Sequence, residues 1–378
     1  MPTLKKDISD KQKRLIELRN KAKAVKGSIA KKTEPVEPEN KPVWDHVVST
    51  GATLVDLAIS GTRREAGGIP GGIMFLMYGP SSSGKTAILT EMIGNIQAIG
   101  GGCKILDPES RLDKEYAQIY GASISDDKNY HKPNTVSEAY KDYIYKWDAL
   151  GFPENKLSII AADSISALST DLEMSNEDGD KMGMRRAKEF SSSCRKAARI
   201  ISGKNRLLTY TSQIRIDKDA HGKEVIPGGM AIVFYASLIG RTAMIARIER
   251  ESVIMRKVKN AKGKEEMRKL ELSKVIGIKS SFYISKSSVD VPFRSAPFYI
   301  TFGVGIDDVR ANLQFCKDMQ VLNSYDCIKT TRPGMDQSIT YIEENDLEAD
   351  LRAKTIMIWH EIDHKMRMKR KIKQRIIL

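Results

Sequence analysis

The sequence predicts an α/β fold with a mainly parallel central sheet, an N-terminal helix and a small C-terminal domain. Between about residues 47 and 305, short apolar runs alternate with helical stretches, which indicates a parallel sheet covered on both sides. The runs are almost continuously apolar, as expected of strands buried on both faces. They lie at residues 73–78, 104–106, 157–162 and 207–211. The helix expected at residues 87–99 has Ile88, Met92, Ile96 and Ile99 on one face, which would pack on this sheet.

Residues 1–45 are predicted to form a helix and a linker. A helix is expected at residues 7–26, because Ser9 and Gln12 fit a capping box and apolar residues follow at spacings of three and four. Residues 34–41 (EPVEPENK) contain two prolines and alternating charges, which is typical of a linker. An isolated amphipathic helix cannot bury its apolar face. We therefore expect this helix to dock on its own core or on a neighbouring subunit.

Residues 46–305 form the predicted core, and residues 306–378 a smaller C-terminal domain. Residues 248–279 are rich in charges of both signs and are expected to form an exposed hairpin or a pair of helices. The chain ends in KMRMKRKIKQRIIL, which carries seven Lys/Arg and no acidic residue. Both a tail that captures duplex DNA and a merely solvated tail fit this composition.

Composition limits the possible partners and compartments. The formal net charge is +14, which favours a polyanionic partner because bound phosphates displace condensed counterions. The sequence has no apolar run long enough for a membrane helix, and its start lacks the apolar stretch of a secretory signal. The four cysteines are scattered without a CxxC pair, which predicts a reducing, cytoplasmic location.

The most specific motif is a phosphate-binding loop between an expected strand and an expected helix. GPSSSGKT fits the pattern GxxxxGK(S/T), whose glycines let backbone amides face a phosphate at the N-terminus of a helix. In this pattern Lys85 reaches the β- and γ-phosphates, and Thr86 is a ligand of Mg²⁺. The sequence thus predicts ATP and Mg²⁺ as cofactors. The motif consists of Gly79, Pro80, Ser81, Ser82, Ser83, Gly84, Lys85 and Thr86.

Three further strand ends carry polar side chains. Asp163 ends an apolar run, as in a Walker B strand that holds Mg²⁺, and Glu109 and Gln213 follow two other runs. Because ligands of parallel sheets bind beyond the carboxyl ends of the strands, these side chains should converge on the phosphate-binding loop. Glu109 is then a candidate general base and Gln213 a candidate γ-phosphate sensor. A helix-capping Glu109 and a surface amide at Gln213 are the alternatives.

Together these motifs resemble the RecA family of recombinases. STGATLVDLAIS and GGIPGGIMFLMYGPSSSGKT are similar to the family's entry into its P-loop, and LDPESRLDKEYAQIYG to its catalytic-glutamate segment. SQIR resembles the family's NQIR, and GGMAIVFYAS its GGNALKFYAS. The resemblance runs in order from about residue 45 to 305, with a weaker match in the N-terminal helix. It implies a RecA-like P-loop ATPase core.

The resemblance also assigns roles to individual residues. It implies that Glu109 is the catalytic glutamate, that Gln213 senses the nucleotide, that Asp113 and Tyr116 contact the nucleobase, and that Phe234 meets the neighbouring subunit. Lys286 would reach the neighbour's ATP. Two loops, at roughly residues 170–184 and 214–229, would bind single-stranded DNA. The DNA contacts implied by position are Lys188, Arg195, Arg215, Gly228 and Gly229.

The chain departs from the family pattern at several positions. Met230 and Val233 replace an asparagine and a lysine, and Ser288 stands where bacterial members have a second trans-acting lysine, so that Lys286 alone or Lys286 with Arg294 would serve. The first DNA loop is acidic, and the C-terminal tail is basic where bacterial members are acidic. These departures are typical of a divergent or phage-encoded member.

A second, competing motif lies near the C-terminus. His360, Glu361 and His364 fit the HExxH pattern of zinc proteases. No acid or histidine follows His364 in the sequence, and the cations beyond it would repel Zn²⁺. A solvated helix face is therefore expected here.

The function expected from these observations is an ATP-dependent recombinase. It would assemble as a helical filament on single-stranded DNA, pair that strand with homologous duplex DNA, and hydrolyse ATP to release DNA. Two alternatives remain open: a hexameric helicase with the same core fold, and a regulatory recombinase paralogue that binds ATP and DNA without exchanging strands.

Overall fold

The computed structural model describes most of the chain after the predicted linker. The described residues are 46–126, 128–174, 182–217, 223–227, 230–259, 265–328 and 332–370. The helix predicted at residues 7–26, the linker at 34–41 and the last eight residues of the basic tail lie outside them. No helix in the described part of the chain has both the length and the apolar character to cross a bilayer.

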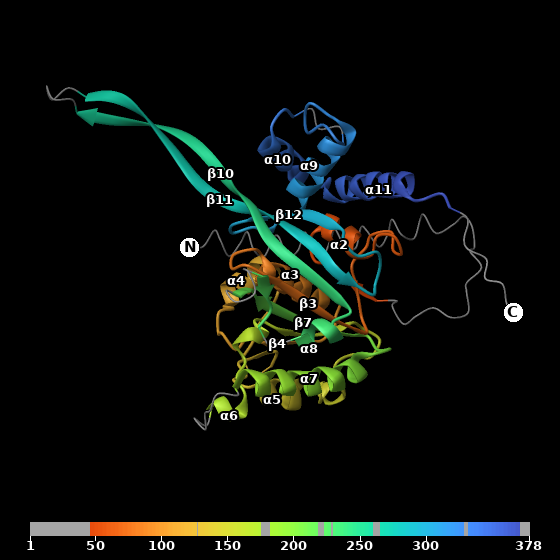
Figure 1. The fold of residues 1–378 in the computed structure, drawn as a ribbon. Helices are drawn as coiled ribbons and strands as arrows, with labels where there is room; N and C mark the ends of the chain where they lie inside the picture. The colour runs from red at the N-terminus through yellow and green to blue at the C-terminus, as the bar shows by residue number, and fades with distance from the viewer. Residues whose placement is uncertain are drawn as a thin grey trace.

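A nine-stranded sheet forms the centre of the molecule (Figure 1), in the order β13-β12-β11-β10-β3-β7-β6-β4-β5. The half that runs from β10 to β5 is parallel, and β10 to β13 pair antiparallel. The predicted α/β fold with a mainly parallel sheet is thus confirmed, with an antiparallel edge added. The parallel strands are β3 (Ile73–Gly79), β4 (Cys103–Leu106), β5 (Tyr130–His131), β6 (Ser158–Ala162) and β7 (Arg206–Gln213). The others are β10 (Leu238–Lys259), β11 (Glu265–Ser287), β12 (Ser295–Thr301) and β13 (Gly305–Ile306).

Helices cover both faces of this sheet, because successive strand residues point to opposite sides. In β3, Phe75 and Met77 enter one buried apolar cluster, and Met74 and Leu76 the other. The first cluster also holds residues of α2 (Thr53–Ser60), α3 (Lys85–Ala98) and α4 (Lys114–Ile119). The second holds residues of α5 (Val136–Glu138), α7 (Met182–Ile201), α8 (Met230–Tyr235) and the helical turns Ala139–Ile144 and Trp147–Leu150.

The remaining elements are two short strand pairs, a few short helical segments and three C-terminal helices. Two small antiparallel pairs form, β1 (Val47–Val48) with β2 (Ile69–Pro70) and β8 (Arg215–Asp217) with β9 (Lys223–Val225). A turn at Ile165–Ala167 and helix α6 (Asp171–Met174) follow β6. Beyond the sheet, α9 (Asp308–Gln320), α10 (Met335–Glu344) and α11 (Glu348–Met366) share a third apolar cluster. These helices fall in the region predicted to be a C-terminal domain.

A long two-stranded ribbon projects away from the rest of the molecule (Figure 1). β10 pairs with β3 only over Leu238–Arg241, and β11 pairs with β12 only over Gly277–Tyr283. Farther out, residues 249–259 and 265–275 pair only with each other. We call these two segments the ribbon. Of the two structures predicted for residues 248–279, the hairpin is the one observed.

Candidate nucleotide-binding site

The predicted phosphate-binding loop lies between β3 and α3, in the strand–loop–helix setting that its motif requires. Gly84 precedes α3 with φ 94°, a left-handed conformation that disfavours side chains. A Cβ on Gly84 would lie 2.8 Å from both Phe298 and Ile300 of β12. At the other end of the loop, a Cβ on Gly79 would lie 2.2 Å from the carbonyl oxygen of Thr242. Close packing against the antiparallel strands thus excludes side chains at both ends.

The side chain of Lys85 lies across this loop. Its Nζ donates to the carbonyl oxygens of Gly79 (3.0 Å) and Pro80 (2.7 Å), and the residue is 7% exposed. Burial lowers the pKa of Lys85, and the carboxylates of Asp163 and Glu109 oppose that shift. The ammonium therefore sits within electrostatic reach of both acidic residues that the sequence predicts for this site.

Asp163 follows β6 and is held by two threonines. Thr86 Oγ1 donates to Asp163 Oδ2 at 2.7 Å, and the Thr211 hydroxyl donates to Asp163 Oδ1. Burial raises the pKa of Asp163, and the two hydroxyl groups oppose that shift. Hydroxyl and carboxylate oxygens are hard donors of the kind that Mg²⁺ prefers. The adjacent Thr86 and Asp163 thus fit the predicted magnesium site.

A second buried carboxylate, Asp107, lies beside Asp163 and was missed in the sequence. Leu106 pairs with Ala162 in the parallel ladder, so the next residues, Asp107 and Asp163, are neighbours at the strand ends. Asp107 is 1% exposed, and its Oδ2 accepts from the amides of Arg111 (2.8 Å) and Leu112 (2.9 Å) and from the Tyr130 hydroxyl (2.8 Å). Asp107 thereby fixes the turn that carries Glu109. The signal that could have identified Asp107 is its position directly after the apolar run at residues 104–106.

Glu109 lies on this turn, at the edge of the site. Its carboxylate pairs with Arg111 at 2.8 Å, and its side chain is 17% exposed. The helix-capping alternative for Glu109 is wrong, because the N-cap of α4 is Asp113, which accepts from the amide of Tyr116 at 2.7 Å. Glu109 is thus free of a capping role and stands close enough to Lys85 to influence its pKa.

Gln213 is brought next to the loop by the sheet itself. It is the last residue of β7 and pairs with Gly79, the first residue of the loop, in the parallel ladder. Two residues later β8 begins, within the segment expected to bind DNA. The sequence predicts Gln213 near the site because it follows an apolar run, and the strand register places it beside Gly79.

The positions expected to hold the nucleobase are near α4. Asp113 caps this helix, and the ring of half-buried Tyr116 lies 4.9 Å from that of Tyr120 at an interplanar angle of 49°. Burial raises the pKa of Tyr116 above that of an ordinary phenol. A role for either residue in base recognition stays a prediction.

Lys286 and Phe234 meet at the end of α8. Lys286 Nζ donates to the carbonyl oxygens of Val233 (2.9 Å) and Phe234 (2.7 Å), which are near the C-terminus of that helix. The Phe234 ring is left outside, and the residue is 74% exposed. Within its own subunit Lys286 therefore supports α8 and the segment from which Phe234 projects.

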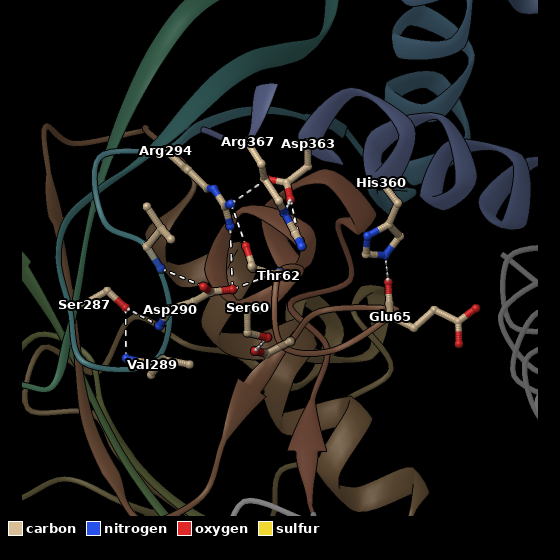
Figure 2. Close-up of polar contacts among 12 residues, drawn as sticks. Ser60, Thr62, Glu65, Ser287, Val289, Asp290, Arg294, His360, Asp363 and Arg367 are labelled. Carbon is tan, nitrogen blue, oxygen red and sulfur yellow. Dashed lines mark hydrogen bonds and ion pairs between the residues drawn. The ribbon is translucent and has the colours of Figure 1, made fainter. Parts of the chain in front are cut away.

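Arg294 holds the C-terminal helix to the core (Figure 2). Its Nη2 donates to Thr62 Oγ1 (2.6 Å) and Asp363 Oδ1 (2.8 Å), and its Nη1 lies 3.6 Å from Asp290. The guanidinium also lies 5.0 Å from the centre of the Trp359 ring. Within a single subunit Arg294 thus serves to hold α11 to the core, and its role as a cation that assists Lys286 toward a neighbouring subunit stays a prediction.

The histidine motif on α11 has contacts that differ from those of a zinc protease. His360 Nε2 lies 2.8 Å from the carbonyl oxygen of Glu65 (Figure 2), and Glu361 pairs with Lys365 in the next turn at 2.6 Å. Within the ranges described, no three His, Cys, Asp or Glu side chains gather as metal ligands. His360 thus contacts the core, whereas Glu361 forms an exposed ion pair within α11.

The described residues that are expected to contact DNA lie on α7 and β8. Lys188 and Arg195 are exposed on α7, and Arg215 is exposed on β8. Gly228 and Gly229, and residues 175–181 of the first DNA loop, lie outside the described residues. The DNA contacts stay predictions.

Comparison of the sequence with protein families and with known proteins points to one family in each case. The family model of the RecA N-terminal domain matches residues 16–307. A protein named "Protein RecA" from Bordetella petrii is 31% identical over 262 residues, which cover 69% of this chain and 64% of that protein. Proteins of the same name from two strains of Anaplasma marginale are 29% identical over 377 residues, covering 95% of this chain and 94% of theirs.

Proposed function

This chain belongs to the RecA family, and from that premise we propose that it is a DNA-dependent ATPase and recombinase. It binds single-stranded DNA with ATP and Mg²⁺, assembles into a helical filament and pairs its strand with homologous duplex DNA in recombination and repair. The observation that carries this proposal is the pairing of Gly79 with Gln213, which joins the phosphate-binding loop directly to the strand that leads into the candidate DNA segment.

The residues of the site divide the work of ATP hydrolysis. Lys85 and the backbone amides of the loop hold the β- and γ-phosphates, as in other P-loops. Thr86 and Asp163 would hold Mg²⁺, which would supply positive charge against the phosphate oxygens. Glu109 accepts the proton of the attacking water. The Asp107 carboxylate, by binding three donors, keeps the Glu109 turn in place.

Nucleotide state is coupled to DNA binding through β7. A γ-phosphate contacted by Gln213 favours one conformation of the segment that begins at β8, and loss of that contact releases it. Phe234 extends this coupling between subunits, since an aromatic ring that is 74% exposed fits an apolar pocket on a second copy. ATP thus acts as a ligand for the DNA-binding state.

The test measures single-stranded DNA affinity by fluorescence anisotropy with ATP, with ADP and without nucleotide, together with ATP hydrolysis with and without DNA. We expect the tightest binding with ATP and hydrolysis stimulated by DNA. Lys85→Ala should abolish hydrolysis. Gln213→Ala should keep ATP binding but remove the effect of ATP on DNA affinity, whereas Gln337→Ala, an exposed glutamine of α10, should leave both intact. Equal DNA affinity in all three nucleotide states would refute the proposal.

Two further measurements separate this function from its alternatives. Electron microscopy with DNA and ATP should show helical filaments, whereas closed rings would indicate a helicase. Strand exchange by the purified protein should be detected. Its absence, with nucleotide and DNA binding retained, would indicate the regulatory paralogue that the changes at Met230, Val233 and Ser288 leave open.

A further inference from the structure

The β8–β9 pair, which lies within the segment expected to bind DNA, is tied to β10 by an ion pair. Glu224 of β9 accepts two hydrogen bonds from the guanidinium of Arg241 in β10, from Nε to Oε2 at 2.9 Å and from Nη2 to Oε1 at 2.6 Å. These hydrogen bonds lower the pKa of Glu224, which favours its charged form. A bidentate pair fixes the mutual orientation of its two groups as well as their distance. The ion pair therefore holds β9 in a defined place relative to the central sheet.

This ion pair lies beside the strand that leads into the phosphate-binding loop. In the parallel ladder Arg241 pairs with Tyr78, the residue before Gly79, and it is the last residue of β10 that pairs with β3. On the other side of β3, Tyr78 pairs with Ser212 of β7, and Gly79 pairs with Gln213. β8 begins two residues after Gln213. The β8–β9 pair is therefore attached to both neighbours of β3: to β7 through the chain and to β10 through the ion pair.

The next residue of β10, Thr242, contacts the phosphate-binding loop itself. Thr242 is fully buried, and its Oγ1 lies 2.6 Å from Ser83 Oγ. Ser83 Oγ in turn donates to the carbonyl oxygen of Pro80 at 2.7 Å. Successive strand residues point to opposite faces, so Arg241 and Thr242 reach different partners from one short segment. Glu224 and Ser83 are thus joined through two adjacent residues of β10.

We propose that Arg241 and Thr242 form a second connection between the phosphate-binding loop and the β8–β9 pair, in which Arg241 is a positioning residue for β9. This inference rests on the proposed function, because it adds a route through β10 to the one through Gln213. A shift of the phosphate-binding loop moves Thr242, and the adjacent Arg241 passes that shift to Glu224. Both residues of β10 act by setting where other groups lie, without touching DNA themselves.

A direct contact between Arg241 and DNA phosphate is the alternative to this positioning role. The contacts favour positioning, because Glu224 balances the charge of Arg241 and engages two of its nitrogen atoms. The two roles also predict different results, since loss of Arg241 removes a cation and loss of Glu224 removes an anion. For a direct phosphate contact, these losses change DNA affinity in opposite directions. For a positioning role, both losses weaken the effect of ATP on DNA affinity.

The test compares Arg241→Gln and Glu224→Gln in the full-length protein with a double variant that exchanges the two charges, Arg241→Glu with Glu224→Arg. Affinity for a fluorescent single-stranded oligonucleotide is measured by anisotropy with ATP and without nucleotide. The readout is the ATP ratio, the affinity with ATP divided by the affinity without it. The control is Arg247→Gln, which removes the same charge from an exposed position of the same strand. Thr242→Val and Thr242→Ser test the other half of the connection in the same assay.

We expect Arg241→Gln and Glu224→Gln each to lower the ATP ratio about five-fold, at the low end of coupling between two sites, because the ion pair is partly solvated. The charge exchange should bring the ratio back to within about two-fold of the unmodified protein, since it rebuilds an ion pair. Thr242→Val, which removes the hydroxyl group and keeps the side-chain shape, should lower the ratio, whereas Thr242→Ser and Arg247→Gln should keep it. Far-ultraviolet circular dichroism should show that all variants fold.

An unchanged ATP ratio in Arg241→Gln, Glu224→Gln or Thr242→Val would overturn this inference, and so would a charge exchange that does not restore the ratio. A change in DNA affinity by the same factor with and without ATP would also overturn it, because that result means general electrostatics or lost stability. Failure of the proposed function looks different. In that case the unmodified protein itself binds single-stranded DNA equally well with and without ATP, whereas failure of this inference alone leaves the ratio of the unmodified protein intact.

Discussion

Replacing Arg294 by alanine should destabilise the contact between α11 and the core without a direct effect on the nucleotide site. Arg294 is 20% exposed in its side chain, and it joins Thr62, Asp290 and Asp363. Its guanidinium also lies over the Trp359 ring. A cation that links three elements in this way acts as a structural residue.

The expected loss of stability follows from what the variant leaves behind. A hydrogen bond to a charged group contributes about 1.5–3 kcal/mol, and a cation over an aromatic ring about 0.5–1 kcal/mol. Asp363 keeps its contact with Arg367, and Asp290 still accepts from the amides of Thr62 and Val291. Because neither carboxylate is left without a partner and the site is partly solvated, we expect a loss of about 2 kcal/mol.

The assay is urea unfolding followed by tryptophan fluorescence, which includes the reporter Trp359 beneath Arg294. The control is Lys365→Ala, which removes an exposed ion pair with Glu361 on the same helix and should leave the unfolding midpoint close to that of the unmodified protein. If the Arg294→Ala variant unfolds at the same urea concentration as the Lys365→Ala variant, the structural role of Arg294 is refuted. Unchanged stability combined with lost ATP hydrolysis would support Arg294 as a cation acting on a neighbouring subunit.

Two further predictions concern buried aspartates. Asp107→Asn should lower the rate of ATP hydrolysis by ten-fold or more, because a weakened turn misplaces Glu109, while nucleotide affinity changes less than about three-fold. Steady-state hydrolysis measures the rate, and stopped-flow binding measures the affinity. Tyr130→Phe removes one of the three donors to Asp107 and should lower the rate of hydrolysis less than Asp107→Asn does. Burial raises the pKa of Asp56 to about 6 from 3.8, against the opposing charge of Arg352 and several hydrogen bonds. Since the folded protein then holds a proton that the unfolded chain has lost, stability should fall by about 2 kcal/mol as pH rises from 4 to 7, and Asp56→Asn should flatten that part of the urea-unfolding profile.

The core of the fold could be predicted because its signals are local. Four of the parallel strands, β3, β4, β6 and β7, contain a short apolar run, and the P-loop contains its own glycines and lysine within eight residues. The ribbon was left undecided between strands and helices, because its charges and apolar residues follow neither period over its length. Only the pairing of β10 with β11 settles that segment.

The parts of the site that escaped prediction depend on contacts distant in the chain. Asp107 gains its role from Tyr130 and from its position beside Asp163, and neither neighbour is visible in the local sequence. Arg294 was considered only because Ser288 replaces a lysine, and its contact with Asp363, 69 residues away on α11, could not be predicted from the local sequence. Conversely, Asp113 has a local explanation as a helix cap that the resemblance did not suggest.

β10 connects the two ends of the molecule mechanically. It runs from Leu238, beside β3, to Lys259 near the outer end of the ribbon, and near its start Thr242 Oγ1 lies 2.6 Å from Ser83 Oγ in the phosphate-binding loop. A partner that moves the outer end is therefore expected to shift, along one continuous strand, a residue that contacts the phosphate-binding loop. The register between β10 and β11 shifts at three places, after Ile239, Met244 and Ile248, and bulges of this kind are the points at which paired strands bend.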